Sequence, residues 1–120
     1  MTNNKPKYNL FKNTKYAIDG LTHAIKTESS FKLELLLSIP IFSAIAYLDI
    51  DIIYKLILII TAFLILIVEL LNSAVENVVD LVTKDYHILA KNAKDIGATA
   101  VMFSISLHIL CWIITIYISY

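Results

Sequence analysis

Glycine, proline, cysteine and arginine are scarce in this chain, and these shortages exclude several kinds of protein. The 120 residues include two glycines, two prolines, one cysteine and no arginine. Two separate glycines, Gly20 and Gly97, cannot form a P-loop or the glycine-rich loop of a protein kinase. One cysteine, Cys111, excludes an internal disulfide bond and any metal site with several cysteine ligands. Ten lysines balance ten acids, so no basic excess points to nucleic acid as a partner.

Apolar residues, in contrast, are abundant. They make up 58% of the sequence, which is more than an ordinary soluble domain of this size contains. Three apolar stretches, at residues 31–48, 52–82 and 96–118, each reach the roughly 20 residues that a bilayer crossing needs. Because backbone groups in lipid must bond to one another, each stretch is predicted to be a helix. We therefore predict an all-α membrane protein with a single domain over residues 1–120.

An amphipathic helix is predicted before the first span, over about residues 8–27. Apolar side chains such as Leu10 and Leu21 fall on one side of this helix, and charged side chains such as Lys15 and Asp19 fall on the other. A helix of this kind lies on the membrane surface with its apolar side toward the lipid.

The distribution of lysine predicts how the spans are oriented. Six lysines precede or open the first span, and three more lie in residues 83–95. Residues 49–55 contain one lysine beside two aspartates, and the C-terminal tail contains none. Since cytosolic loops are enriched in lysine and arginine, the N-terminus and residues 83–95 are predicted to be cytosolic and the C-terminus external.

The second span contains a stripe of polar residues that a helix surrounded by lipid would not tolerate. Its members are three or four positions apart, so they share one face, which must contact protein or a cavity. An ionisable group inside a span costs a few kcal/mol or more, which makes it a candidate for function. The stripe comprises Glu69, Asn72, Ser73, Glu76 and Asp80.

Charged residues of all three spans are predicted to share one layer at the cytosolic interface. Glu69 follows Ile52 by 17 residues. At 1.5 Å per residue it lies about 25 Å from the outer end of its span, near the inner edge of the hydrocarbon. The layer comprises Glu28, Glu34, Glu69, Asn72, Glu76, Asp80, Lys94 and Asp95.

The chemistry of this layer favours a divalent cation and a proton acceptor. Mg²⁺ takes oxygen ligands, typically one or two carboxylates together with phosphate oxygens, and Glu28 with Glu76 can supply such a pair from two helices. Glu69, which is deeper and partly desolvated, suits a general base.

Structural interpretations remain open for the same residues. Asn72 and Ser73 can join helices by hydrogen bonds, and Glu34 can pair with Lys32 or extend toward water. Exposed surface charge is the simpler interpretation of Asp80, Lys84 and Asp85. His108 and Cys111 are interpreted as packing residues, because one histidine and one cysteine make no complete site.

The segment ELLNSAVENVVD, followed by YHILAKNAKDIGATAV, closely resembles the signature of the bacterial diacylglycerol kinase family of small membrane lipid kinases. The resemblance extends over nearly the whole chain and includes GLTHAIKTESSFKLE. One branch of the family phosphorylates diacylglycerol and the other undecaprenol. The chain length, LDIDIIYK and DIGATAV look more like the first branch, whereas ENVVD and LAKNAKD fit both.

The resemblance implies a homotrimer in the bacterial plasma (inner) membrane, with active sites shared between subunits. Its reaction would be the transfer of the γ-phosphate of ATP to diacylglycerol, with Mg²⁺ as cofactor and phosphatidic acid as product. Glu69 would be the catalytic base and Asn72 would order the site, while Glu28 and Glu76 would hold the metal. ATP contacts would come from Asn9, Tyr16, Glu28, Glu76, Asp85, Tyr86, His87, Lys94 and Asp95. Lipid contacts would come from Thr14, Ser30, Phe31, Glu34, Glu69 and Ala98.

The chain departs from the family pattern at two positions. Asn9 stands where the family has arginine, and Lys12 is a possible substitute. Ala98 stands where the family tends to have serine, and the hydroxyl of Thr99 lies about 100° further around the helix.

The partners that the resemblance implies are ATP, diacylglycerol, membrane lipids and further copies of the chain.

Two alternatives to a diacylglycerol kinase follow from the same sequence. The first is an undecaprenol kinase of the same family. The second belongs to another class, a non-catalytic membrane protein or small ion carrier. A carrier is expected to place ionisable groups near the membrane midplane on several helices. Here they gather at one face of the membrane, which counts against a carrier.

Overall fold

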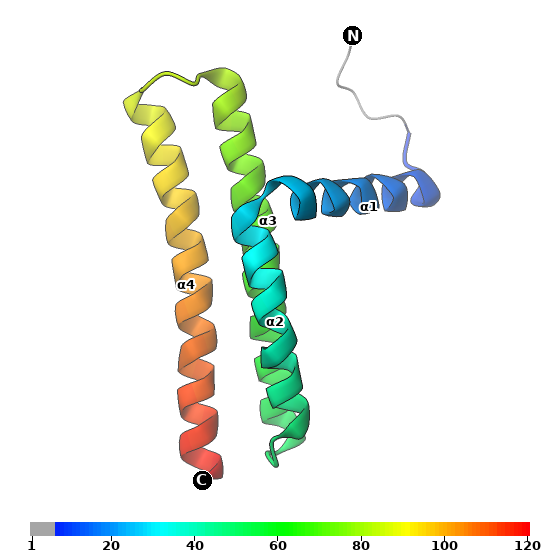
Figure 1. Cartoon of the computed structure of the whole chain (residues 1–120), viewed down its shortest axis with the longest axis vertical. Helices are drawn as coiled ribbons and strands as arrows, with labels where there is room; N and C mark the ends of the chain where they lie inside the picture. Colours follow the sequence, from blue (N-terminus) through cyan, green and yellow to red (C-terminus); the bar gives the residue numbers. More distant parts are fainter. Residues whose placement is uncertain (1–6) are drawn as a thin grey trace.

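The computed structural model describes residues 7–120 and has four helices in that range (Figure 1). Three of them run along the long axis of the molecule, and α1 lies across that axis (Figure 1). α3 packs against both α4 and α2. The predicted class, an all-α membrane protein, is confirmed. The regular elements of residues 7–120 are all helices, and α2, α3 and α4 are long and apolar enough to cross a membrane. The helices are α1 (Leu10–Thr27), α2 (Ser29–Tyr47), α3 (Ile52–Val82) and α4 (Ile88–Ser119).

The corner between α1 and α2 is formed by a single residue, Glu28. It ends α1 and begins α2 with an extended backbone, at φ −98° and ψ 101°. One extended residue turns the chain from the crosswise helix into the first span. Glu28 therefore lies where the two helices meet. This arrangement fits the predicted surface helix on a membrane.

α4 extends further than the third predicted span. The prediction placed this span at 96–118, but the helix already begins at Ile88, so only residues 83–87 separate α3 from α4. The charged residues of this segment indicate contact with water and do not indicate a loop. Its alanine, leucine and lysine residues are strong helix formers, which favours a helix here. Lys91 and Asp95 also form an ion pair one turn apart, which supports helix. The other helix boundaries lie within two residues of the predicted ones.

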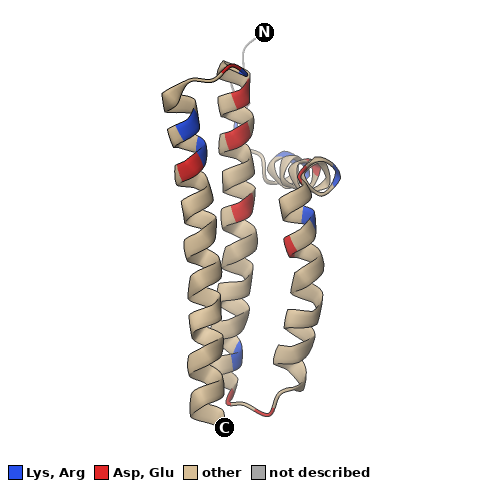
Figure 2. Ribbon diagram, turned by 60° about the vertical axis from the view of Figure 1, so that its left-hand side comes forward, with Lys and Arg blue, Asp and Glu red and all other residues tan. Residues whose placement is uncertain are grey.

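The charged residues of α2 and α4 lie toward one end of each helix, and those of α3 lie in the half nearest that end apart from Lys55 at the other end (Figure 2). On α3 no charged residue lies between Lys55 and Glu69, and on α4 none follows Asp95. A charge-free zone of this kind is what the hydrocarbon core of a bilayer requires. Helix length and composition therefore agree on three membrane spans.

Polar side chains make up much of the protein interior. Among residues 7–120, eight polar or charged residues are buried against five hydrophobic ones, while most large apolar side chains are exposed. Lipid tails are as apolar as leucine, so membrane helices associate through small residues, close packing and hydrogen bonds. The buried polar set is Ser38, Thr61, Glu69, Asn72, Ser73, Ser104, His108 and Thr115.

One buried hydrogen-bond chain links α3 to α4 about 20 Å from the charged layer, since His108 follows Lys94 by 14 residues. Trp112 Nε1 donates to Nε2 of His108 at 2.9 Å. The indole nitrogen can only donate, so a neutral His108 carries its proton on Nδ1 and donates to Oγ1 of Thr61 at 2.7 Å. The threonine hydroxyl donates to the backbone carbonyl of Ile57 at 3.0 Å. His108 is therefore a polar link as well as a packing residue.

Replacing this histidine is expected to weaken the contact between α3 and α4. His108→Leu removes the bond to Thr61 and leaves Trp112 Nε1 without a partner inside the protein. We expect a loss of about 1–2 kcal/mol, the range found for hydrogen bonds between membrane helices in model peptides. Thermal unfolding in detergent measures the loss, with Cys111→Ala on the same helix as control. An unchanged midpoint for His108→Leu would show that the chain of bonds adds no stability.

Candidate active site

The polar stripe of α3 faces the protein interior in its first half, as the spacing predicted. Glu69, Asn72 and Ser73 are only 4%, 8% and 5% exposed. Glu76 is half-buried and Asp80, at the end of the stripe, is exposed. The stripe therefore leads from a buried carboxylate near the charge-free zone to a solvated carboxylate at the end of the helix (Figure 2).

Two further carboxylates of the predicted layer, Glu28 and Glu76, are each oriented by an asparagine. Glu28 Oε1 accepts a hydrogen bond from Asn77 Nδ2 at 3.3 Å, although the two residues are 49 positions apart. Glu76 Oε1 accepts one from Asn72 Nδ2, also at 3.3 Å. Glu76 lies about two helical turns beyond Glu69 on the same stripe of α3. Each of the two carboxylates thus has one oxygen held by an amide.

This arrangement fits a divalent cation that is shared with a phosphate group. No cluster of three or more histidine, cysteine or acidic side chains with metal-binding geometry occurs within residues 7–120. A cation held only by protein would need more ligands than Glu28 and Glu76 provide. Mg²⁺ commonly takes one or two carboxylates and completes its shell with water and phosphate oxygens. The donor set therefore suits Mg²⁺ together with a nucleotide.

Glu34 lies at a cavity between α2, α3 and α4. The cavity measures about 200 Å³, and its lining is almost entirely apolar apart from Glu34, Ser38 and His108. Oε2 of Glu34 is buried, and it has no hydrogen-bond partner in the described part of the chain. One structural interpretation was an ion pair between Glu34 and Lys32. The two ion pairs found among residues 7–120 do not include it. Glu34 is thus a carboxylate with a free acceptor beside an apolar space.

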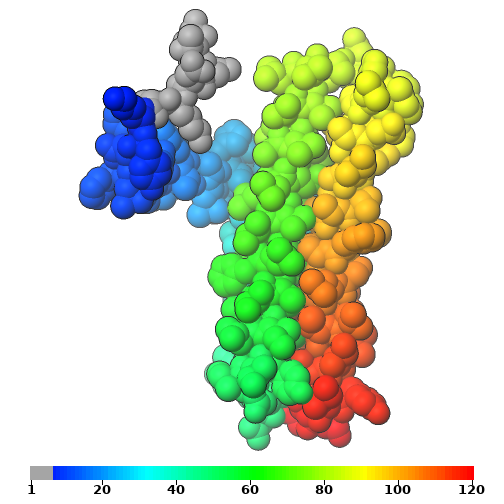
Figure 3. Space-filling view, turned by 180° about the vertical axis from the view of Figure 1, so that it is seen from behind, coloured from blue at the N-terminus to red at the C-terminus, as the bar shows by residue number. Residues whose placement is uncertain are grey.

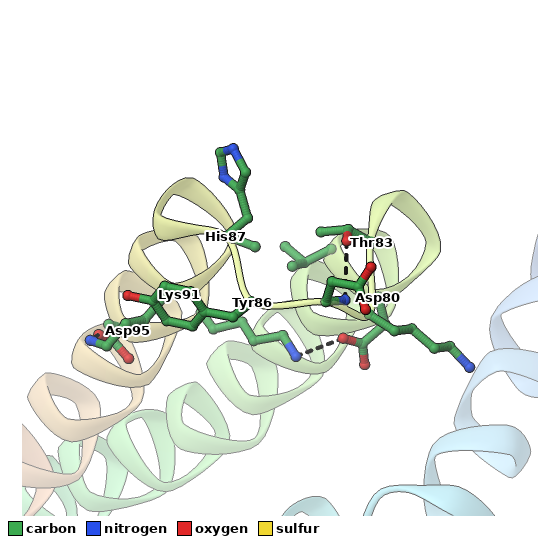
Figure 4. A pocket seen from close by; sticks show the side chains of 11 residues that line it. Asp80, Thr83, Tyr86, His87, Lys91 and Asp95 are labelled. Carbon is green, nitrogen blue, oxygen red and sulfur yellow. Dashed lines mark hydrogen bonds and ion pairs between the residues drawn. The ribbon is translucent and has the colours of Figure 1, made fainter.

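A second pocket of about 370 Å³ lies where α3 ends and α4 begins (Figure 4). Two ion pairs border it, Lys94 with Asp80 at 2.6 Å and Lys91 with Asp95. His87 points away from the other labelled side chains (Figure 4), and its Nδ1 accepts the backbone N–H of Leu89 at the start of α4. Five predicted ATP contacts line this pocket: Asp85, Tyr86, His87, Lys94 and Asp95.

The remaining predicted ATP contacts are not brought to this pocket within one chain. α1 projects from the bundle as an arm (Figure 3); Tyr16 is exposed on it, and Asn9 is exposed just before its first residue. The side chain of Asn9 accepts the backbone N–H groups of Phe11 and Lys12 and so caps α1. Asn9 therefore has a structural role that the sequence did not indicate.

The predicted lipid contacts are also divided. Thr14 lies on α1, and its hydroxyl donates to the carbonyl of Leu10. Ser30 and Ala98 are exposed. Phe31, in contrast, is only 2% exposed. Its side chain therefore presents almost no surface to a lipid in the single chain. Phe31 is a core residue of this fold.

The sequence did not single out Gly97 as part of the site, and the structure places it directly against Asn72. A β-carbon at position 97 would lie 2.2 Å from Oδ1 of Asn72. A lone glycine inside a predicted membrane helix was the available signal, because glycine permits close approach of backbone to a neighbouring group.

Comparison with known proteins then decides the family. The sequence model of the prokaryotic diacylglycerol kinase family matches residues 15–116. The chain belongs to this family. The resemblance seen in the sequence is confirmed, and the protein is a lipid kinase of the diacylglycerol kinase family in a bacterial membrane.

Named relatives support the same assignment. The diacylglycerol kinase of Escherichia coli K12 is 35% identical over 118 residues, which cover 98% of this chain and 97% of the relative. That of Pseudomonas aeruginosa is 35% identical over 99 residues, covering 82% and 80%. That of Synechocystis is 38% identical over 97 residues, covering 80% of this chain and 55% of the relative. The diacylglycerol kinase family is thus supported over nearly the full length of the chain.

Proposed function

We propose that this chain phosphorylates diacylglycerol with ATP and Mg²⁺ and releases phosphatidic acid. The observation that carries the proposal is the buried carboxylate of Glu69 beside two carboxylates that asparagines orient. The depth of this group suits a meeting of a lipid hydroxyl with a nucleotide phosphate. The naming of the relatives as diacylglycerol kinases favours diacylglycerol over undecaprenol.

In the proposed reaction Glu69 accepts the proton of the lipid hydroxyl. The lipid oxygen then forms a bond to the γ-phosphorus of ATP, while the bond from that phosphorus to the bridging oxygen breaks and ADP leaves. Glu28 and Glu76 would hold Mg²⁺, which neutralises phosphate charge when bound. Lys94 would contact phosphate after exchanging its present partner Asp80. Positioning and charge neutralisation supply most of the catalysis in phosphoryl transfer, so a P-loop is not required.

A homotrimer with shared active sites is part of the proposal. Thr14 and Tyr16 lie on the projecting arm α1, whereas five other predicted nucleotide contacts line the pocket where α3 ends and α4 begins. An arm that projects from one subunit is suited to reach a neighbour. The many exposed apolar side chains provide a surface that can contact lipid and other copies of the chain.

A phosphorylation assay on the purified protein tests this function. Diacylglycerol and undecaprenol are offered side by side in mixed micelles with ATP and Mg²⁺. Faster turnover of diacylglycerol is expected. A preference for undecaprenol would contradict the proposed substrate and leave the kinase chemistry intact. Turnover of neither lipid would contradict the proposed reaction.

The orientation proposed for the membrane has its own test. The hydroxyl of Tyr120 donates to the carbonyl of Asp49, so the C-terminus and the turn between α2 and α3 lie at the same end. In a Cys111→Ala background, a Tyr120→Cys variant should react with an impermeant thiol reagent added to the periplasmic side. An Asn92→Cys variant, also at an exposed position, should not react. The reverse pattern would place the acidic layer on the side without ATP.

A further inference from the structure

The side-chain amide of Asn72 fills a space on α4 that exists because residue 97 is glycine. A β-carbon built on Gly97 would lie 2.2 Å from Oδ1 and 3.3 Å from Cγ of Asn72, and a β-carbon contact under 3.0 Å is essentially never seen. No glycine among residues 7–120 has a positive φ, so the backbone conformation does not require glycine here. What requires it is the close approach of Asn72.

The two ends of this amide have different surroundings. Asn72 is 8% exposed, and its Nδ2 donates to Glu76 Oε1 at 3.3 Å. Its Oδ1 is buried against Gly97 and has no hydrogen-bond partner among the described residues. Leaving a buried acceptor without a partner is unfavourable, so the orientation needs a compensating reason. The bond to Glu76 is the only one that the amide makes within the described chain.

We infer that Gly97 is a positioning residue that keeps the amide of Asn72 directed at Glu76. With one carboxylate oxygen held by Asn72, the other oxygen of Glu76 stays available for a divalent cation. This inference rests on the proposed function, in which Glu76 is a ligand of Mg²⁺. Hydrogen-bond partners that orient metal ligands typically change metal affinity or activity by about 10–100-fold when removed.

Gly97→Ala is a selective probe, because the atom it displaces is the end of a side chain and not backbone. Alanine also favours helix more than glycine does, so the variant should unfold at the same temperature or higher. Gly20→Ala is the matched control, since a β-carbon at Gly20 meets nothing within 4 Å. Both variants make the same chemical change inside a helix, and only one of them reaches Asn72.

The measurement is Mn²⁺ binding to the purified protein in detergent with a non-hydrolysable ATP analogue, followed by electron paramagnetic resonance. It needs no turnover. We expect Gly97→Ala to weaken Mn²⁺ binding by about 10–100-fold, whereas Gly20→Ala should bind like the wild type. Wild-type affinity in Gly97→Ala would overturn the inference.

A double-mutant cycle separates positioning through Asn72 from general damage to packing. Asn72→Ala should weaken Mn²⁺ binding as Gly97→Ala does. The double variant should bind no more weakly than Asn72→Ala alone, because removing the amide leaves room for the new methyl group. Additive losses would overturn the inference, since they would mean that residue 97 acts by another route.

Two further outcomes distinguish this inference from the proposed function. If Glu76→Gln binds Mn²⁺ as tightly as the wild type, Glu76 is not a ligand, and the metal assignment falls together with the role of Gly97. If Glu76→Gln loses binding but Gly97→Ala does not, the metal assignment stands and only the positioning role is overturned.

Discussion

Glu69→Gln is expected to lower kcat by about 10²–10⁴-fold, the usual effect of losing general acid–base catalysis. Glutamine keeps the shape of glutamate and can form hydrogen bonds, but it cannot accept the proton of the lipid hydroxyl. The KM for ATP should change little, because the proposed role of Glu69 lies in the chemical step. Turnover of diacylglycerol at saturating ATP measures the effect.

The stability of the same variant shows whether Glu69 also supports the fold. Glu69 is 4% exposed, and neither ion pair of the described residues includes it. Removing a buried charge that lies near Glu28 and Glu76 should leave thermal stability unchanged or raise it. Ser73→Ala, at an equally buried position one turn further, is the control and should keep activity within a few-fold. If Glu69→Gln keeps wild-type activity, Glu69 is not the base, and if it unfolds, its role is structural.

The spans could be predicted from the sequence because their signal is local. The predicted second span and α3 cover the same residues, 52–82. Asp51 marks the start of α3, where its side chain accepts the N–H of Ile53 at 2.8 Å. The start of α4 was missed, because the prediction followed the apolar run from residue 96, whereas the helix already begins at Ile88. Hydropathy reports where a helix leaves the lipid, and it does not report where the helix ends.

The site was only partly predictable, because its decisive contacts join residues far apart in the chain. Spacing along one helix was enough to place Glu69 and Asn72 on a buried face. The bond between Asn77 and Glu28 and the fit of Asn72 against Gly97 depend on how α3 meets its neighbours. One sequence carries no direct record of such contacts between helices. The same holds for the bond from His108 to α3.

Glu76→Gln is expected to nearly abolish turnover and to lower the apparent affinity for Mg²⁺. The amide oxygen of glutamine can still accept the hydrogen bond from Asn72, so the change removes charge and leaves the local geometry in place. A hard cation binds a carboxylate far better than an amide, and Mg²⁺ depends on few protein ligands at such sites. Activity measured across a Mg²⁺ titration should show a residual rate that rises only at high Mg²⁺ concentration.

The control for this titration is a carboxylate at the other end of the molecule. Asp49 lies in the turn between α2 and α3, beyond the charge-free zone, so Asp49→Asn removes the same charge without reaching the site. Its Mg²⁺ dependence should equal that of the wild type. If Glu76→Gln behaves like Asp49→Asn, Glu76 does not hold the metal. The asparagine-held carboxylate would then serve to position the nucleotide or the lipid, and Glu28 would be left as the single candidate ligand from this pair.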